Sequence, residues 1–93
     1  MRIHFVGIGG IGVSALVQYF ISIGHEVSGS DLVSSEIIEA LEKKGVKIFL
    51  GKHKKENLPK KADLVIYSPA IPKTNPELIE ALKIRNLKLK IEV

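Results

Sequence analysis

The chain contains no cysteine, no tryptophan, and few aromatic residues, with two Tyr and three Phe among 93 residues. The absence of cysteine excludes a disulfide framework and any thiolate metal site. The three histidines, His4, His25 and His53, are too scattered in the sequence to suggest a metal-binding cluster. We therefore expect no metal site in this chain.

Long apolar runs are also missing. No stretch reaches the roughly 18 residues that predict a membrane-spanning helix, so we expect no membrane span. Met1-Arg2 leads directly into an apolar strand-like segment, without the basic and then apolar pattern of a signal peptide. With no cysteine either, the expected location is the cytoplasm.

The charge is unevenly divided along the chain. Residues 1–42 hold one basic and five acidic residues, a net −4, whereas residues 43–93 hold thirteen basic and five acidic residues, a net +8. A basic half can attract nucleic acid or phosphorylated ligands. However, the lysines are interspersed with apolar residues and form neither a recognition-helix pattern nor an aromatic stacking motif. We expect no nucleic-acid partner, and such a partner would show itself by strongly salt-dependent binding.

The most informative stretch is the glycine turn, Gly7-Ile8-Gly9-Gly10-Ile11-Gly12. It lies between an apolar run that ends at Val6 and a helical pattern that begins near Val13. A strand, a tight glycine turn and a helix form the unit that binds a diphosphate at the helix N-terminus. In this interpretation Gly7 allows the sharp turn, Gly9 allows the backbone N–H groups to approach the phosphates, and Gly12 allows close packing of helix on strand. Glycines also cluster in ordinary turns, so the alternative is a turn with no ligand.

Hydrophobic periodicity divides the rest of the chain into short elements. Apolar runs or alternation predict strands, and spacings of three and four predict helices. The Gly24 and Gly45 positions end helices, Ser34 or Ser35 caps one, and Asn75 or Thr74 caps another. The expected strands are 2–6, 25–29, 46–50, 64–67 and 87–93, and the expected helices are 11–23, 34–44 and 75–82, with a possible short helical turn at 56–58.

This order of elements predicts an α/β fold. We expect one Rossmann-like three-layer domain, residues 1–93, with a five-stranded parallel sheet in the order 3-2-1-4-5. The strand 87–93 alternates apolar residues with charged ones, which is typical of an edge strand. Ligands of such a sheet bind at the C-terminal ends of the strands, near the point where the strand order reverses.

Asp31 follows Gly12 by nineteen residues and closes the second strand. At that position an acidic side chain reaches the ribose hydroxyls in dinucleotide-binding folds. No Arg or Lys follows it closely, which disfavours NADP. The alternative is that Asp31 only caps the turn before Ser34.

Two further segments follow strands at the ligand-facing edge. His53 and Asn57 lie in the polar loop after the third strand, where either could bond a base or ribose or simply face solvent. Ser68-Pro69-Ala70-Ile71-Pro72 cannot make regular ladder bonds, because two prolines remove donors. It is either a ligand wall or a stiff connector, and Lys73 after it is best interpreted as a solvated lysine.

The length argues against a complete dinucleotide site, which uses about six strands in two halves. The Walker pattern for ATP phosphates is absent, and no nucleophile–base arrangement is evident. The residues alone therefore suggest a module that binds a nucleoside diphosphate and carries no catalytic residue.

Several segments together resemble the N-terminal domain of Mur ligases. They are His4 to Gly12, Gly29-Ser30-Asp31, His53 with Asn57, and Ser68-Pro69-Ala70-Ile71 with Asn75-Pro76-Glu77. They occur in order over almost the whole chain. The departures are Val13 where Met is common, Ala15 where Gly is common, Pro69 where Ser is common, and Lys52 between Gly51 and His53.

The resemblance implies that the chain is the first domain of a larger ligase, with central and C-terminal domains elsewhere. It implies a UDP-N-acetylmuramic acid site here, and ATP and Mg²⁺ used by the full-length enzyme to join L-alanine to the muramic acid carboxylate in peptidoglycan synthesis. The 93-residue chain alone is expected to be inactive and to need no cofactor. Two alternatives remain: the relative that attaches a recycled murein tripeptide, and a free-standing NAD-sensing domain.

The resemblance also implies residue roles. The diphosphate would lie on the glycine turn, the uridine near Asp31 and His53, and the far wall of the cleft after the fourth strand. The expected substrate-binding residues are Gly7, Gly9, Gly10, Ile11, Gly12, Ser30, Asp31, His53, Ser68, Ala70 and Ile71.

Overall fold

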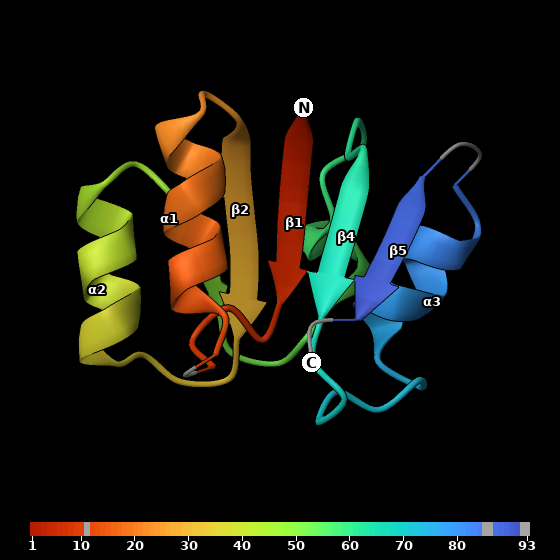
Figure 1. The fold of residues 1–93 in the computed structure, drawn as a ribbon. Helices are drawn as coiled ribbons and strands as arrows, with labels where there is room; N and C mark the ends of the chain where they lie inside the picture. Colours follow the sequence, from red (N-terminus) through yellow and green to blue (C-terminus); the bar gives the residue numbers. More distant parts are fainter. Residues whose placement is uncertain (11, 85–86, 92–93) are drawn as a thin grey trace.

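The computed structural model describes residues 1–10, 12–84 and 87–91. These described residues form nine elements, which follow one another along the chain as Figure 1 shows. They are β1 (Arg2–Val6), α1 (Ser14–Ser22), β2 (Glu26–Asp31), α2 (Glu36–Lys43), β3 (Lys47–Leu50), η1 (Lys55–Asn57), β4 (Leu64–Tyr67), α3 (Pro76–Leu82) and β5 (Lys88–Ile91). None of the helices in the described ranges combines the length and apolar character needed to cross a bilayer.

All strand pairs are parallel, and the sheet order is β3-β2-β1-β4-β5. The α/β class and the order of the first four strands confirm the prediction. The fifth element, β5, pairs with β4 from Lys88 to Ile91, and the last residues of the predicted strand, 92 and 93, lie outside the described residues. The strand β2 extends two residues beyond its predicted end, because Ser30 and Asp31 pair with Val6 and Leu50 of its two neighbours.

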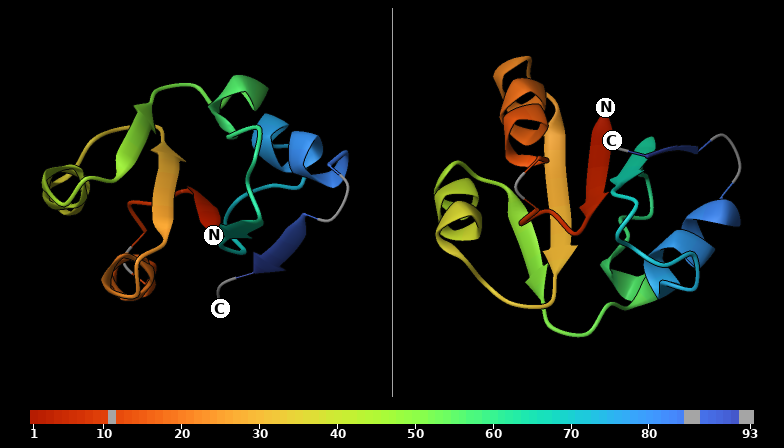
Figure 2. Two further views of the ribbon diagram at one scale, coloured as in Figure 1. Left: turned by 90° about the horizontal axis from the view of Figure 1, so that it is seen from above. Right: turned by 60° about the horizontal axis from the view of Figure 1, so that its bottom comes forward.

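Helices α1 and α2 cover one face of the sheet, and α3 with η1 covers the other (Figure 2). Side chains of β1 alternate between these faces, as strand geometry requires. Ile3 and Phe5 pack in the core under α1 and α2, whereas Val6 packs in the smaller core under α3. His4 points to the same face as Val6, so the sequence places a buried polar side chain beneath α3.

Two helices begin at side-chain caps. The Ser35 hydroxyl accepts a hydrogen bond from the Ile38 N–H at 3.2 Å, and the Asn75 side chain accepts one from the Glu77 N–H at 2.9 Å. Ser35 and Asn75 were both among the predicted caps. The helix α1 differs, since its N-cap position is Val13 and no side chain in the described part of the chain caps it.

Helical spacing in the sequence predicts buried sides that the structure only partly reproduces; they are Ala15, Leu16, Tyr19, Phe20 and Ile23 for α1, and Leu78, Ile79 and Leu82 for α3. Tyr19 and Ile23 on α1, and Ile79 and Leu82 on α3, are exposed. The buried side of α3 consists of Glu77, Leu78 and Ala81 instead. A helix of seven residues has room for only two turns of contacts, and here a carboxylate in the first turn occupies one of the buried positions.

Candidate functional site

The glycine turn leaves β1 and is fastened to β2. The N–H groups of Gly7 and Ile8 both donate to the carbonyl oxygen of Ser30, at 2.8 and 3.0 Å. Gly7 has φ +82°, a left-handed conformation that glycine adopts without strain, which confirms its predicted turning role. Ile8 is fully buried and packs over Gly29, where a Cβ would lie 2.4 Å from the Ile8 Cδ1. Glycine at position 29 is therefore what lets the turn cross β2 closely.

Asp31 at the end of β2 holds the middle of the turn. Its Oδ2 accepts a hydrogen bond from the Gly9 N–H at 2.8 Å, and its Oδ1 accepts one from the Leu32 N–H at 2.8 Å. A Cβ on Gly9 would lie 2.8 Å from Asp31 Oδ2 and 2.9 Å from the Ile38 Cδ1. The fold itself therefore requires glycine at position 9, because a side chain there has no room and the N–H is bonded to Asp31; the expected approach of a diphosphate to this turn stays a prediction.

The close packing of helix on strand that was expected to require Gly12 is not observed. A Cβ there would meet no atom within 4 Å, so close helix-to-strand packing does not require this glycine. Gly12 is exposed at the start of α1. Ile11, the remaining predicted residue of the turn, lies outside the described residues.

At the start of α1, the described residues supply acceptors for some backbone N–H groups but not for others. The Gly10 and Val13 N–H groups bond to carbonyl oxygens within the turn, at 3.2 and 3.1 Å. Among the described residues, no acceptor takes the N–H of Gly12 or Ser14, and the first turn carries no acidic residue. Uncapped N–H groups and the helix dipole favour an anion at this end.

The segment after β4 lies beside the same turn. The Ile71 side chain approaches Gly7, with its Cδ1 3.0 Å from where a Cβ on that glycine would be. Its backbone N–H donates to the Ser68 carbonyl at 3.0 Å, which closes a tight turn. Ser68 is half-buried and Ala70 is exposed. The ends of β1, β2 and β4 thus bring Gly7, Asp31 and Ile71 to one edge of the sheet.

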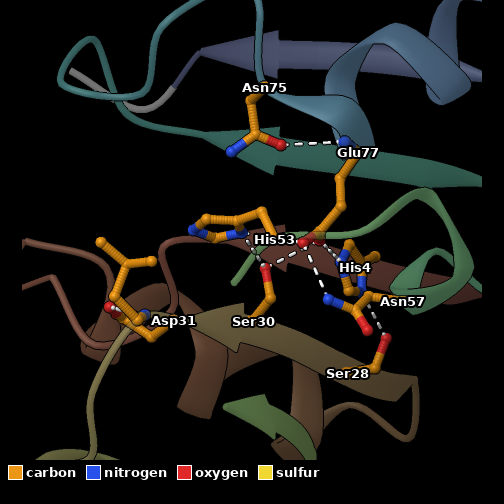
Figure 3. Close-up of polar contacts among 9 residues, drawn as sticks. His4, Ser28, Ser30, Asp31, His53, Asn57, Asn75 and Glu77 are labelled. Carbon is orange, nitrogen blue, oxygen red and sulfur yellow. Dashed lines mark hydrogen bonds and ion pairs between the residues drawn. The ribbon is translucent and has the colours of Figure 1, made fainter. Parts of the chain in front are cut away.

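A second group of polar residues lies beneath α3 and is centred on the fully buried Glu77 (Figure 3). We call Glu77 and its four donors the Glu77 cluster; the donors are His4, Ser30, His53 and Asn57. One carboxylate oxygen accepts from His4 Nε2 at 2.6 Å and from the Ser30 hydroxyl at 2.7 Å. The other accepts from His53 Nδ1 at 2.8 Å and from the Asn57 amide at 3.1 Å. The cluster joins β1, β2, the loop before η1, η1 itself and α3.

The charge of Glu77 is stabilised by these donors. Burial alone would raise the pKa of its carboxyl, but the hydrogen bonds from His4, Ser30, Asn57 and His53 outweigh burial and lower the pKa from 4.5 to about 2. His4 is held in turn by a 2.8 Å hydrogen bond between its Nδ1 and the Ser28 hydroxyl. No buried side-chain nitrogen or oxygen in the described part of the chain lacks a partner. The cluster is therefore a fully satisfied ionic network.

Sequence reasoning selected Ser30, His53 and Asn57 but missed Glu77 and His4 as members of one group. Glu77 follows Pro76 in the first helical turn, a position where an acidic residue is usually explained by the helix dipole alone. A usable signal was His4, a polar residue in the middle of the apolar run from Ile3 to Val6. Such a residue on a buried strand needs a partner on the facing element.

A groove of about 690 Å³ lies beside β2 and β3 toward the opposite edge of the sheet, and it reaches the Glu77 cluster at Asn57. Its lining includes Ser28, Phe49 and Asn57 but none of the eleven residues predicted to bind substrate. In the described residues no three His, Cys, Asp or Glu side chains are grouped so that they could hold a metal ion. The glycine turn and the Glu77 cluster are therefore the better candidate site.

Comparison with known proteins identifies the family. The family model described as "Mur ligase family, catalytic domain" matches residues 2–90. This chain belongs to the Mur ligase family. The membership confirms the resemblance inferred from the sequence, and it associates the chain with ligases of peptidoglycan synthesis.

Three Mur ligase relatives illustrate the similarity. UDP-N-acetylmuramate–L-alanine ligase of Clostridium botulinum is 53% identical over 88 residues, which cover 95% of this chain and 19% of the relative. The crystal structure of UDP-N-acetylmuramate–alanine ligase MurC from Thermotoga maritima superposes with a TM-score of 0.88 at 38% identity, covering 98% of this chain and 20% of that one. A murein peptide ligase from Psychrobacter arcticus has a TM-score of 0.79 at 30% identity, covering 96% and 18%. The chain thus spans about a fifth of the length of the ligases it matches.

Proposed function

We propose that this chain is the first domain of a UDP-N-acetylmuramate–L-alanine ligase and that it binds UDP-N-acetylmuramic acid. The observation that carries the proposal is the 53% identity, over 95% of the chain, to a protein of that name. The share of the relative that is covered, 19%, is consistent with further ligase domains outside this chain.

The geometry supports a nucleoside diphosphate at the C-terminal edge of the sheet. The N–H groups of Gly12 and Ser14 at the uncapped start of α1 suit the diphosphate. Asp31 and His53 lie on the β2 side of the turn, where they suit the uridine. Ser68, Ala70 and Ile71 follow β4 on the other side, where they suit the sugar. Gly7, Gly9 and Gly10 shape the turn that separates the two sides.

Asp31 has two functions in this proposal. Its carboxylate holds the Gly9 N–H and the Leu32 N–H, which is the structural role considered as the alternative for this residue. A carboxylate has capacity for about four hydrogen bonds, so two accepted bonds leave room for ribose hydroxyls. We propose that the same side chain shapes the turn and binds the ligand.

The ligation chemistry belongs to other parts of the full-length protein. The sequence has no Walker pattern, and the described residues group no set of three metal-ligand side chains, so these residues do not fit Mg²⁺-ATP. We derive no catalytic step from this chain, and we expect it to be inactive by itself.

Calorimetric titration with UDP-N-acetylmuramate, UDP and NAD tests the proposal. We expect the order of affinity UDP-N-acetylmuramate, then UDP, then NAD, because adenine does not match a uracil site and a nicotinamide half-site is missing. Tighter saturable binding of NAD than of both uridine compounds would contradict the proposal and favour a dinucleotide-sensing domain. This titration does not separate the proposal from its murein peptide ligase alternative, because a similar ligase of that kind is itself named for UDP-N-acetylmuramate.

A further inference from the structure

His53 reaches from the Glu77 cluster to the surface. Its side chain is only 12% exposed, and its Nδ1 lies 2.8 Å from Glu77 Oε2 and 3.1 Å from the Ser30 hydroxyl oxygen. Its other ring nitrogen, Nε2, has no partner among the described residues. Since no buried side-chain nitrogen there lacks a partner, Nε2 must be accessible to solvent. Figure 3 shows it directed away from Glu77, on the side where Asp31 lies.

The neighbours of His53 decide which nitrogen carries the proton. An ionised carboxylate can only accept, so Glu77 requires a proton on His53 Nδ1. The Ser30 hydroxyl donates its own proton to Glu77 Oε1 at 2.7 Å, so its oxygen is also an acceptor toward Nδ1. In the neutral ring Nε2 then carries a lone pair and accepts hydrogen bonds.

Glu77 is itself fixed in position. Its side chain is fully buried, and its backbone N–H donates to Asn75 Oδ1 at 2.9 Å. Its other carboxylate oxygen is held by His4, whose second nitrogen is paired with the Ser28 hydroxyl at 2.8 Å. The carboxylate therefore cannot turn away from His53 without losing donors from β1 and β2.

We propose that Glu77 is a positioning residue for ligand recognition: it holds the proton of His53 on Nδ1, so that Nε2 accepts a hydrogen bond from the N3–H of a uracil base. This inference rests on the proposed nucleoside diphosphate site. A lone pair at Nε2 repels phosphate oxygens and matches an imide N–H. Cytosine has an acceptor at the same ring position, so the arrangement selects uridine over cytidine nucleotides.

The test combines histidine tautomers with nucleotide preference. In the natural full-length protein labelled with ¹⁵N-histidine, NMR distinguishes a protonated from an unprotonated ring nitrogen at His53. We expect Nδ1 to be protonated and the Nε2 signal to shift when UDP is added. UDP should bind at least about tenfold more tightly than CDP. The uracil N3–H donates a hydrogen bond to Nε2, whereas the acceptor of cytosine at the same position would face the Nε2 lone pair.

The variant Glu77→Gln changes the proton arrangement with little change of shape. The glutamine amide can donate to His53 Nδ1, which allows the proton to move to Nε2. We expect a changed His53 tautomer and a preference for UDP over CDP reduced to within about twofold, as the specific hydrogen bond is lost. Glu80→Gln, the same substitution one turn later on α3 and outside the cluster, is the matched control and should leave both readouts unchanged.

The wild-type measurements decide the question even if Glu77→Gln fails to fold. A proton on His53 Nε2 in the UDP-bound wild type overturns this inference alone and leaves the UDP site standing. Equal affinity for UDP and CDP also overturns it. Failure of UDP to bind at all overturns both this inference and the proposed function.

Discussion

Glu77 is one carboxylate with four side-chain donors, and its protonation connects the folding equilibrium to pH. The pKa of its carboxyl is about 2 in the folded chain, compared with 4.5 for an unperturbed glutamate. The folded state therefore favours the ionised form. This stabilisation is fully present above pH 4.5 and is lost as the pH falls toward 2. The difference between these two pKa values corresponds to about 3 kcal/mol in the free energy of unfolding.

Urea unfolding between pH 7 and pH 2.5 checks this expectation. Wild type should lose about 2–3 kcal/mol more stability than Glu77→Gln over the acid part of that range, because the variant has no carboxyl to protonate at this position. Glu80→Gln should follow the wild-type curve. Parallel losses in wild type and Glu77→Gln would mean that the Glu77 charge contributes nothing to folding.

Gly29 and Gly12 form a matched pair for a second residue-scale prediction. Gly29→Ala places a Cβ 2.4 Å from the Ile8 Cδ1, so we expect destabilisation of about 1–3 kcal/mol from overpacking. Gly12→Ala meets no atom within 4 Å and should change stability by no more than about 0.5 kcal/mol. Thermal unfolding of the two variants compares them directly, and an equal effect would contradict the close crossing of the turn over β2.

At the scale of elements, most boundaries followed from local chemistry. Apolar runs predicted β1 and β4 with the bounds observed, and Ser35 and Asn75 were correctly among the expected caps. The start of α1 was placed too early, because the turn extends through Val13. The length of this turn could not be predicted locally, because Asp31 at the end of β2 holds its middle through the Gly9 N–H.

The buried face of α3 could not be predicted from periodicity. A charged residue counts as exposed in any amphipathic pattern, so Ile79 and Leu82 were assigned to the core in its place. Burial of Glu77 depends on donors from four other segments of the chain, and such long-range pairing leaves no local signal. The same limit applied to the candidate site, where individual residues were found but their common partner was not.

This burial pattern makes an element-scale prediction. Leu82 is 71% exposed whereas Leu78 is 4% exposed. Leu82→Gln should therefore change the free energy of unfolding by no more than about 0.5 kcal/mol, and Leu78→Ala should cost about 2–5 kcal/mol. Denaturant unfolding of both variants provides the check. A large loss in Leu82→Gln would show that α3 packs by the face that periodicity predicted.

At the scale of the whole molecule, the sheet order places the glycine turn, the end of β2 and the segment after β4 at one edge. Parallel strands with right-handed crossovers made the order β3-β2-β1-β4 predictable. The crowding at Gly9 was not predictable, because it depends on where side chains of β2 and α2 lie, and neither was the open space at Gly12. The fold and the meeting of these segments at one edge therefore follow from pattern, whereas the hydrogen-bond partners at that edge follow only from the assembled structure.

The central claim is that this edge binds the uridine diphosphate part of UDP-N-acetylmuramate, and an amide-resolved NMR titration of the 93-residue chain tests it most directly. We predict shifts at Gly12 and Ser14, whose N–H groups have no acceptor among the described residues, and at Asp31 and His53. The sugar should add shifts at Ser68 to Ile71 that UDP alone does not cause. The Gly12→Ala substitution adds one methyl group at the proposed diphosphate position, where a Cβ meets no protein atom within 4 Å. It should therefore weaken binding without unfolding the chain. Saturable binding that leaves the amides of Gly12, Ser14 and His53 unchanged would contradict the account.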